Sequence, residues 1–319
     1  MIIDVHHYIF LDQRNKEMQN SQVGWTICLS LVSMDALGTQ TAILYSPPPT
    51  ESLVQARQYS LNLSQLCALY PGRFGFFTCL PTSDDIQGVL EEIAFALDEL
   101  HADGFALLSS YGQGSTARYI VNDHYDPIWK ELDRRHAVVL LHGTQTPSSI
   151  PCPHAFLGLP ISEQVDSQRD LQSSCLPGGD WQKNSNFQTS KIIFAHLGGS
   201  TPFLAPRVAV LSHHMRCPLS PEEILQDFGT FYYETALSSH EATLAAIEAF
   251  VPADHILFGS DFPDKVLSLV STVMSAWYMK HLREYYIKEP VELDHILRVN
   301  ALAFFLRLRD LSATTLKPS

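Results

Sequence analysis

Short apolar runs rich in β-branched residues alternate along the chain with longer segments that have helical spacing. The spacing is clearest at 86–100, where apolar residues recur at steps of three and four before a stop at 101–104. The runs that we predict as strands are 2–6, 41–45, 74–80, 104–109, 137–142, 191–196, 230–235 and 255–260. The segments that we predict as helices are 86–100, 126–135, 201–213, 239–250 and 264–282.

Nearly continuous apolar strands, each followed by a helix, are typical of a parallel sheet covered on both faces. Eight such units favour an α/β fold of the (β/α)8 TIM-barrel type over an open doubly wound sheet. A dinucleotide-binding sheet is disfavoured further, because no GxGxxG segment follows the first strand. We therefore predict that 1–319 form a single barrel domain, with a C-terminal helix at about 293–308 outside the barrel.

Two stretches do not fit the alternation of strands and helices. Residues 144–190 are rich in Pro, Ser, Gln and Gly and show little periodicity. Residues 11–30 carry Gln, Asn and Arg and also lack a clear period. Long loops in a compact domain are usually functional, so we interpret both stretches as insertions at the rim of the barrel, the longer one as an elaborated loop.

Hydrophobic residues make up 45% of the 319 residues and charged residues 17%, as in an ordinary soluble protein. Lys and Arg number 21 against 34 Asp and Glu, for a formal net charge of −13. This balance argues against nucleic acid or an anionic membrane surface as a partner, because both attract basic patches. No apolar run is long enough to span a membrane, and the first residues lack a signal-peptide pattern. With six scattered cysteines and no CxxC pair, we expect a cytoplasmic protein.

Titratable side chains end or directly follow four of the predicted strands: His6, His142, His196 and Asp261. The carboxyl ends of barrel strands meet at one mouth, where function collects in this fold. A titratable group there loses hydration and is usually kept for a partner, a metal or catalysis. A single histidine after a strand is more often a satisfied core or rim residue. Together, three imidazoles and a carboxylate predict an N/O site suited to Zn²⁺ or Mn²⁺.

Sequence segments near these strand ends also carry a family resemblance. They are Asp4-Val5-His6, Phe74-Gly-Phe-Phe, Leu97-Asp-Glu-Leu, Asp103-Gly104, His142, Ile193-Phe-Ala-His-Leu-Gly-Gly199, Phe231-Tyr-Tyr-Glu-Thr-Ala-Leu-Ser238 and Leu257-Phe-Gly-Ser-Asp-Phe-Pro263. In this order they resemble the amidohydrolase-related decarboxylases, among them the aminocarboxymuconate-semialdehyde, γ-resorcylate and fungal 6-methylsalicylate enzymes. The resemblance runs from the first residue to about 307 and is interrupted at 152–190.

The resemblance implies roles for the residues at the strand ends. His6, His142 and Asp261 look like metal ligands, and His196 looks like the general acid/base beside them. Asp261 is a second route for the proton. Arg207, on the helix predicted after the sixth strand, resembles a residue that reaches the carboxylate of the substrate, although a solvated arginine on a helix face is an equally open interpretation.

The first strand departs from the family pattern at Tyr8. The family usually ends this strand in His-x-His, because residues two apart on a strand lie on one face and can bind one ion. Here His6 and Tyr8 share the inward face, while His7 points the other way. Tyr8 therefore faces the substrate side of the site, with water, substrate or tyrosinate filling the place of the missing ligand. A glycine also follows His142, where the family commonly has proline.

The implied reaction is the non-oxidative, metal-dependent loss of CO₂ from a small aromatic acid, salicylate-like and of polyketide origin, such as 6-methylsalicylate. This would make the chain a carboxy-lyase of secondary metabolism, and by resemblance alone a homodimer. One alternative is a metal-dependent hydrolase of a lactone or amide on the same barrel. Another, motivated by Tyr8 and by 144–190, is a metal-free pseudoenzyme of a biosynthetic pathway. Glu234 on the seventh predicted strand either orients His196 or bonds to a backbone amide.

Overall fold

The fold was analysed in a computed structural model of the chain. The structure describes residues 1–10, 25–46, 52–81, 85–111, 118–120, 122–143, 190–211, 219–263, 268–305 and 307–309. The loop expected at 144–190 lies outside these residues, apart from Ser190 at its end. So does 11–24 of the first expected insertion.

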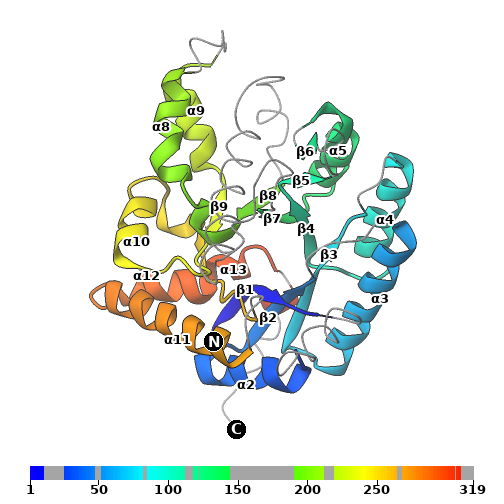
Figure 1. Cartoon of the computed structure of the whole chain (residues 1–319), viewed down its shortest axis with the longest axis horizontal. Coiled ribbons are helices and arrows are strands. Elements are labelled where there is room, and N and C mark those ends of the chain that lie inside the picture. The colour runs from blue at the N-terminus through cyan, green and yellow to red at the C-terminus, as the bar shows by residue number, and fades with distance from the viewer. Residues whose placement is uncertain are drawn as a thin grey trace, which may run out of the picture.

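Within the described residues, eight parallel strands form one sheet in the order β1-β2-β3-β4-β7-β8-β9-β10. Helices lie between the strands and surround them (Figure 1). The predicted (β/α)8 barrel is confirmed. The strands are β1 (Ile3–Tyr8), β2 (Thr41–Tyr45), β3 (Phe74–Cys79), β4 (Gly104–Leu108), β7 (Val138–His142), β8 (Lys191–Phe194), β9 (Tyr232–Glu234) and β10 (Ile256–Leu257).

The helices that were predicted from apolar spacing are present with small shifts at their ends. They are α4 (Ile86–Asp98), α5 (Asp126–Arg134), α8 (Thr201–Leu211), α10 (Glu241–Glu248) and α11 (Ser268–Tyr285). Others were not predicted: α2 (Ile27–Leu37), α3 (Leu53–Leu69) and α9 (Pro221–Gly229). The hairpin of β5 (Ser110–Tyr111) and β6 (Arg118–Tyr119) was also missed.

The start of α2 corrects the prediction that 11–30 form one loop. Thr26 caps this helix, its side chain accepting from the backbone N–H of Leu29, and Gly38 ends it at a φ of 78°. The apolar period is weak because the buried face of α2 carries Ser30 and Ser33 beside apolar residues. A helix with buried polar groups hides its amphipathic pattern from the sequence.

The C-terminal helix is a series of short pieces, not the single helix predicted at 293–308. A π-helical turn (His295–Val299) lies between α12 (Pro290–Asp294) and α13 (Asn300–Leu302). Asn300, the first residue of α13, links this region to the barrel, because its Nδ2 donates to the carbonyl of Ile256 at 2.8 Å. The helix therefore packs directly on the start of β10.

The barrel closes between β1 and the segment that contains β10, where no regular ladder runs. Backbone hydrogen bonds join Val5 N to Phe258 O at 2.9 Å, Asp261 N to His6 O at 3.0 Å and Tyr8 N to Phe262 O at 2.7 Å. The pairing of β1 with β2 is interrupted between Asp4 and His7. This seam carries three of the predicted site residues, His6 and Tyr8 on one side and Asp261 on the other.

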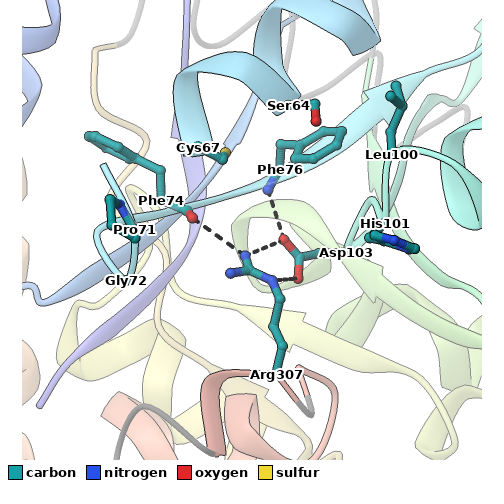
Figure 2. Close-up of a pocket in the computed structure, with 10 residues that line it drawn as sticks. All are labelled: Ser64, Cys67, Pro71, Gly72, Phe74, Phe76, Leu100, His101, Asp103 and Arg307. Carbon is teal, nitrogen blue, oxygen red and sulfur yellow. Dashed lines mark hydrogen bonds and ion pairs between the residues drawn. The ribbon is translucent and has the colours of Figure 1, made fainter. Parts of the chain in front are cut away.

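The amino ends of β3 and β4 hold an ion pair at the opposite end of the barrel from the predicted site. Arg307 binds both oxygens of Asp103 at 2.6 Å, and Asp103 accepts from the backbone N–H of Phe76 at 2.9 Å. Figure 2 shows this pair beside a cavity of about 360 Å³. A side chain at Gly75 would collide with both members of the pair, so the close approach needs glycine.

No helix in the described part of the chain is both long enough and apolar enough to cross a bilayer.

Candidate metal centre

Three side chains predicted as metal ligands lie together at the carboxyl mouth of the barrel. His6 comes from β1, His142 ends β7, and Asp261 follows β10. One ligand atom from each lies within 4.8 Å of the others, and all three residues are buried. The three side chains meet here because the parallel strands of a barrel all end at one rim.

Glu234 fixes the orientation of the His6 ring. Nδ1 of His6 lies 2.8 Å from Oε1 of Glu234 and so carries the proton. Nδ1 of His142 lies 2.6 Å from the carbonyl oxygen of Gly143 and is likewise the protonated nitrogen. Each ring therefore presents Nε2, the nitrogen that can act as a metal ligand, to the mouth of the barrel.

His196 completes the same pattern from the corner after β8. Its Nδ1 lies 3.1 Å from the carbonyl oxygen of Ala236, and its Nε2 lies 3.4 Å from Nε2 of His142. In the neutral rings Nδ1 carries the proton, so both Nε2 atoms have a lone pair. Two lone pairs that face each other repel unless a proton or a cation lies near them. The chemistry of this donor set therefore fits a metal ion.

The carboxylate of Asp261 gives a second test of the fit. Its Oδ1 is buried and makes no hydrogen bond of good geometry among the described residues, and its near neighbour is Nε2 of His6, 3.0 Å away, with which it forms an ion pair. A buried carboxylate oxygen needs a positive partner, either a protonated imidazole or a cation. Asp261 is also held at a φ of 60°, an unfavourable conformation that collects at functional sites. An ion shared by this oxygen and the imidazoles would satisfy it.

The corner that presents His196 has an unusual backbone. His196 and Leu197 have φ values of 56° and 52°, and two glycines follow them with positive φ. The backbone N–H of His196 donates to Oε1 of Glu234 at 2.7 Å. Residues other than glycine rarely adopt these backbone angles, so the corner is a strained turn that points the imidazole inward.

Glu234 proves to be a central residue of the site. Its carboxylate accepts from the ring of His6 and from the backbone N–H groups of His196 and Ala236, the latter at 2.7 Å. The sequence had left open whether Glu234 orients His196 or bonds to a backbone amide; it accepts from two backbone amides, one of them that of His196, while the ring that it contacts is that of His6. A Cβ at position 259 would collide with this carboxylate, so Gly259 makes room for it.

The charges of this cluster are strongly coupled. Burial alone would lower the pKa of His6, but the carboxylates of Glu234 and Asp261 outweigh it and raise that pKa to about 10. Burial conversely favours the neutral form of Glu234, yet the adjacent His6 holds the pKa of this carboxyl below its usual value. Without a metal ion, the imidazole of His6 is therefore protonated at neutral pH.

Two tyrosine hydroxyls approach the nitrogens that would bind an ion. The hydroxyl of Tyr8 lies 2.9 Å from Nε2 of His142, and that of Tyr45 lies 2.9 Å from Nε2 of His6. Tyr8 thus faces inward beside His6, as predicted from the strand alternation. Tyr45 was missed, although its position at the end of β2 was a usable signal. Burial and the nearby Tyr8 raise the pKa of Tyr45 well above its ordinary value.

Arg207 does not join this cluster in the structure. It lies on α8 with its side chain exposed, and a role at the substrate remains a prediction. A cavity of about 310 Å³ instead adjoins His196 between α8 and α10. Its lining includes Leu197, Phe203, Leu237 and Ala246.

Comparison with known proteins places the chain in a family. The amidohydrolase family model matches residues 50–307. The 6-methylsalicylic acid decarboxylase acuB of Aspergillus aculeatus is 34% identical over 286 residues, which cover 83% of this chain and 84% of that protein. The 6-methylsalicylic acid decarboxylase of Penicillium expansum is 32% identical over 280 residues, covering 82% and 85%.

A solved structure has a fold similar to that of this chain. The dihydroxybenzoic acid decarboxylase of Polaromonas sp. JS666, with bound manganese and 2-nitroresorcinol, has a TM-score of 0.77 at 21% identity and covers 95% of this chain and 96% of its own. The chain belongs to the amidohydrolase family. Within that family it groups with the decarboxylases, so the predicted resemblance and the prediction of a carboxy-lyase are confirmed.

Proposed function

We propose that this chain is a metal-dependent, non-oxidative decarboxylase of an aromatic acid that carries a hydroxyl group ortho to its carboxylate, such as 6-methylsalicylate. The observation that carries the proposal is the convergence of Nε2 of His6 and His142 with Oδ1 of Asp261 at the barrel mouth. The 32–34% identity to 6-methylsalicylic acid decarboxylases supports the substrate class.

His6, His142 and Asp261 would hold a divalent ion, Zn²⁺ or Mn²⁺. Nitrogen and carboxylate ligands suit both ions. When bound, the ion supplies a Lewis acid that orients and polarises the carboxylate and the ortho oxygen of the substrate. Glu234 fixes the His6 ring for this purpose, as carboxylates behind ligand histidines do in other proteins.

His196 would supply the proton. Its Nδ1 is held by the carbonyl of Ala236, so its Nε2 is the nitrogen that faces the reacting group. With His196 as the imidazolium, the proton goes from Nε2 to the ring carbon that bears the carboxylate, and the neutral imidazole that is left takes a proton from solvent before the next turnover. The carbon–carbon bond then breaks, its electron pair returns to the ring, and CO₂ leaves with no change of oxidation state elsewhere. Asp261 is the second candidate for this proton transfer.

The cavity beside His196 would take the substituted part of the ring. Its lining combines apolar side chains, among them Leu197, Phe203, Leu237 and Ala246, with polar ones such as Ser238 and Thr243, and the apolar part suits an alkyl group on an aromatic acid. The Tyr8 hydroxyl would donate to a substrate oxygen, and Arg207 is the predicted partner for the carboxylate. A cytoplasmic homodimer that acts in secondary metabolism remains our expectation.

The test combines metal content with product analysis. Purified protein is assayed for bound metal and then incubated with 6-methylsalicylate, with and without added Zn²⁺ or Mn²⁺. We expect a bound divalent ion and equal amounts of CO₂ and 3-methylphenol. Hydrolysis of lactones without CO₂ would favour the hydrolase alternative instead. Protein that neither holds nor takes up metal would favour the pseudoenzyme.

A further inference from the structure

A buried carboxylate lies beside the candidate metal centre on β1, two residues before His6, where the register of the strand is irregular and its side chain contacts His7. Asp4 is 1% exposed and has no arginine or lysine partner among the described contacts. Its Oδ1 accepts from the backbone N–H of His6 at 3.1 Å and from that of Ser260 at 3.0 Å. Its Oδ2 accepts from Ser260 Oγ at 2.5 Å and from His7 Nδ1 at 3.0 Å.

His7 extends this network away from the site. Its Nε2 lies 2.9 Å from the hydroxyl of Ser30, which accepts from Trp25 Nε1 at 2.9 Å. Ser30, His7 and Asp4 thus have the order of a hydrolytic triad. Ser30 is 0% exposed, however, and its hydroxyl is used by both neighbours, so it cannot serve as a nucleophile. The arrangement is a means of holding Asp4 in place.

The network spans the seam of the barrel where the regular ladder is missing. The β10 strand is only Ile256–Leu257, and the β1 pairing is interrupted just where Asp4 lies. Asp4 accepts from the backbone N–H of His6 on one side of the seam and from that of Ser260, the residue before Asp261, on the other. A direct bond from Asp261 N to His6 O at 3.0 Å adds to this link.

We propose that Asp4 is a positioning residue for the metal centre, a role that rests on the proposed function in requiring an ion at this site. By binding both sides of the seam, Asp4 sets the 3.0 Å separation between Nε2 of His6 and Oδ1 of Asp261. It also holds Asp261 in its unfavourable backbone conformation, which the local sequence would not adopt unaided.

The chain offers a matched control at the other end of the barrel. Asp103 is also buried, at 4% exposed, and it too binds a backbone N–H group, that of Phe76. Its ion-pair partner is Arg307, and none of the residues around it belongs to the metal centre (Figure 2). Loss of either carboxylate lowers stability, but only loss of Asp4 disturbs the ligands.

The experiment measures Co²⁺ binding by the full chain, by competition with a chelator and by the visible spectrum of bound Co²⁺. We expect Asp4→Asn to weaken Co²⁺ binding by about 10- to 100-fold and to shift the spectrum, as loss of groups behind metal ligands does elsewhere. Asparagine has one acceptor oxygen where aspartate has two, so it cannot accept all four hydrogen bonds from His6, Ser260 and His7. Asp103→Asn should lower the unfolding temperature while leaving affinity and spectrum unchanged.

A milder variant keeps the test usable should Asp4→Asn not fold. Ser260→Ala removes one hydrogen bond to Asp4 and one from the backbone N–H of Phe262, and leaves the bond from the Ser260 backbone to Asp4 intact, so a smaller loss of affinity in the same direction is expected. Wild-type affinity and spectrum in folded Asp4→Asn or Ser260→Ala would overturn the positioning role alone. Wild-type protein that binds no Co²⁺ would contradict the proposed function itself, and with it this role.

Discussion

The hydroxyl of Tyr8 lies 2.9 Å from Nε2 of His142, the atom that would bind a metal ion. Because Nδ1 of His142 donates to the Gly143 carbonyl, Nε2 is the acceptor and Tyr8 is the donor. The hydroxyl therefore competes with an ion for this lone pair. Tyr8 must turn away when an ion binds, and its hydroxyl is then free to bind the substrate.

Two substitutions at Tyr8 test this competition. Tyr8→Phe removes the competing hydrogen bond, worth about 1 kcal/mol, so metal affinity should rise about fivefold. The Michaelis constant for 6-methylsalicylate should rise about tenfold, because a hydrogen bond to a charged substrate is lost. Tyr8→His should bind metal more tightly and decarboxylate at an equal or higher rate. Chelator competition and steady-state kinetics measure both; no change in either variant would place Tyr8 outside the site.

Glu234 is expected to control metal affinity through the ring of His6. Glu234→Gln can still accept one hydrogen bond, but it no longer offers a carboxylate to Nδ1. We expect metal binding to weaken about 10- to 100-fold. Glu92→Gln is the matched control, since Glu92 is equally buried but pairs with Arg57 away from the site. Equal metal affinities in the two variants would contradict the prediction.

The metal-free protein should lose stability as pH rises. The folded-state pKa of His6 is about 10, above its ordinary value of 6.5, because the neighbouring carboxylates favour the charged form despite burial. The resulting stabilisation is fully present below pH 6.5 and is lost as pH rises through 10. Urea unfolding of chelator-treated protein across this range measures the trend. A His6→Gln variant should lack it, and a wild-type curve that is flat with pH would refute the assignment.

The cavity beside His196 should decide which substituted rings are accepted. Ala246 lines this cavity on α10, whereas the preceding Ala245 is exposed on the same helix. Ala246→Phe should lower kcat/KM for 6-methylsalicylate about tenfold or more, with a smaller loss for unsubstituted salicylate. Ala245→Phe should leave both values unchanged. An identical loss for the two acids would indicate that the ring substituent lies elsewhere.

Most strand positions could be predicted because buried parallel strands have nearly continuous apolar sequences. The run at 41–45 matches β2 at both ends, and the run at 137–142 ends at the same histidine as β7. Helices such as α2 were harder to find, since its buried face includes serines and its exposed face includes Val32. A mixed face weakens the 3.6-residue period on which helix prediction depends.

The amino-acid sequence by itself determined that the chain forms a barrel of alternating strands and helices, and that His6, His142, His196 and Asp261 follow its strands. These are local properties, carried by apolar runs and the residues next to them. The tertiary structure alone decided how far apart these side chains lie. It also decided the roles of Glu234, Tyr45 and Asp4. Their partners lie up to 256 positions away in the chain, and only closure of the barrel brings such distant groups into contact.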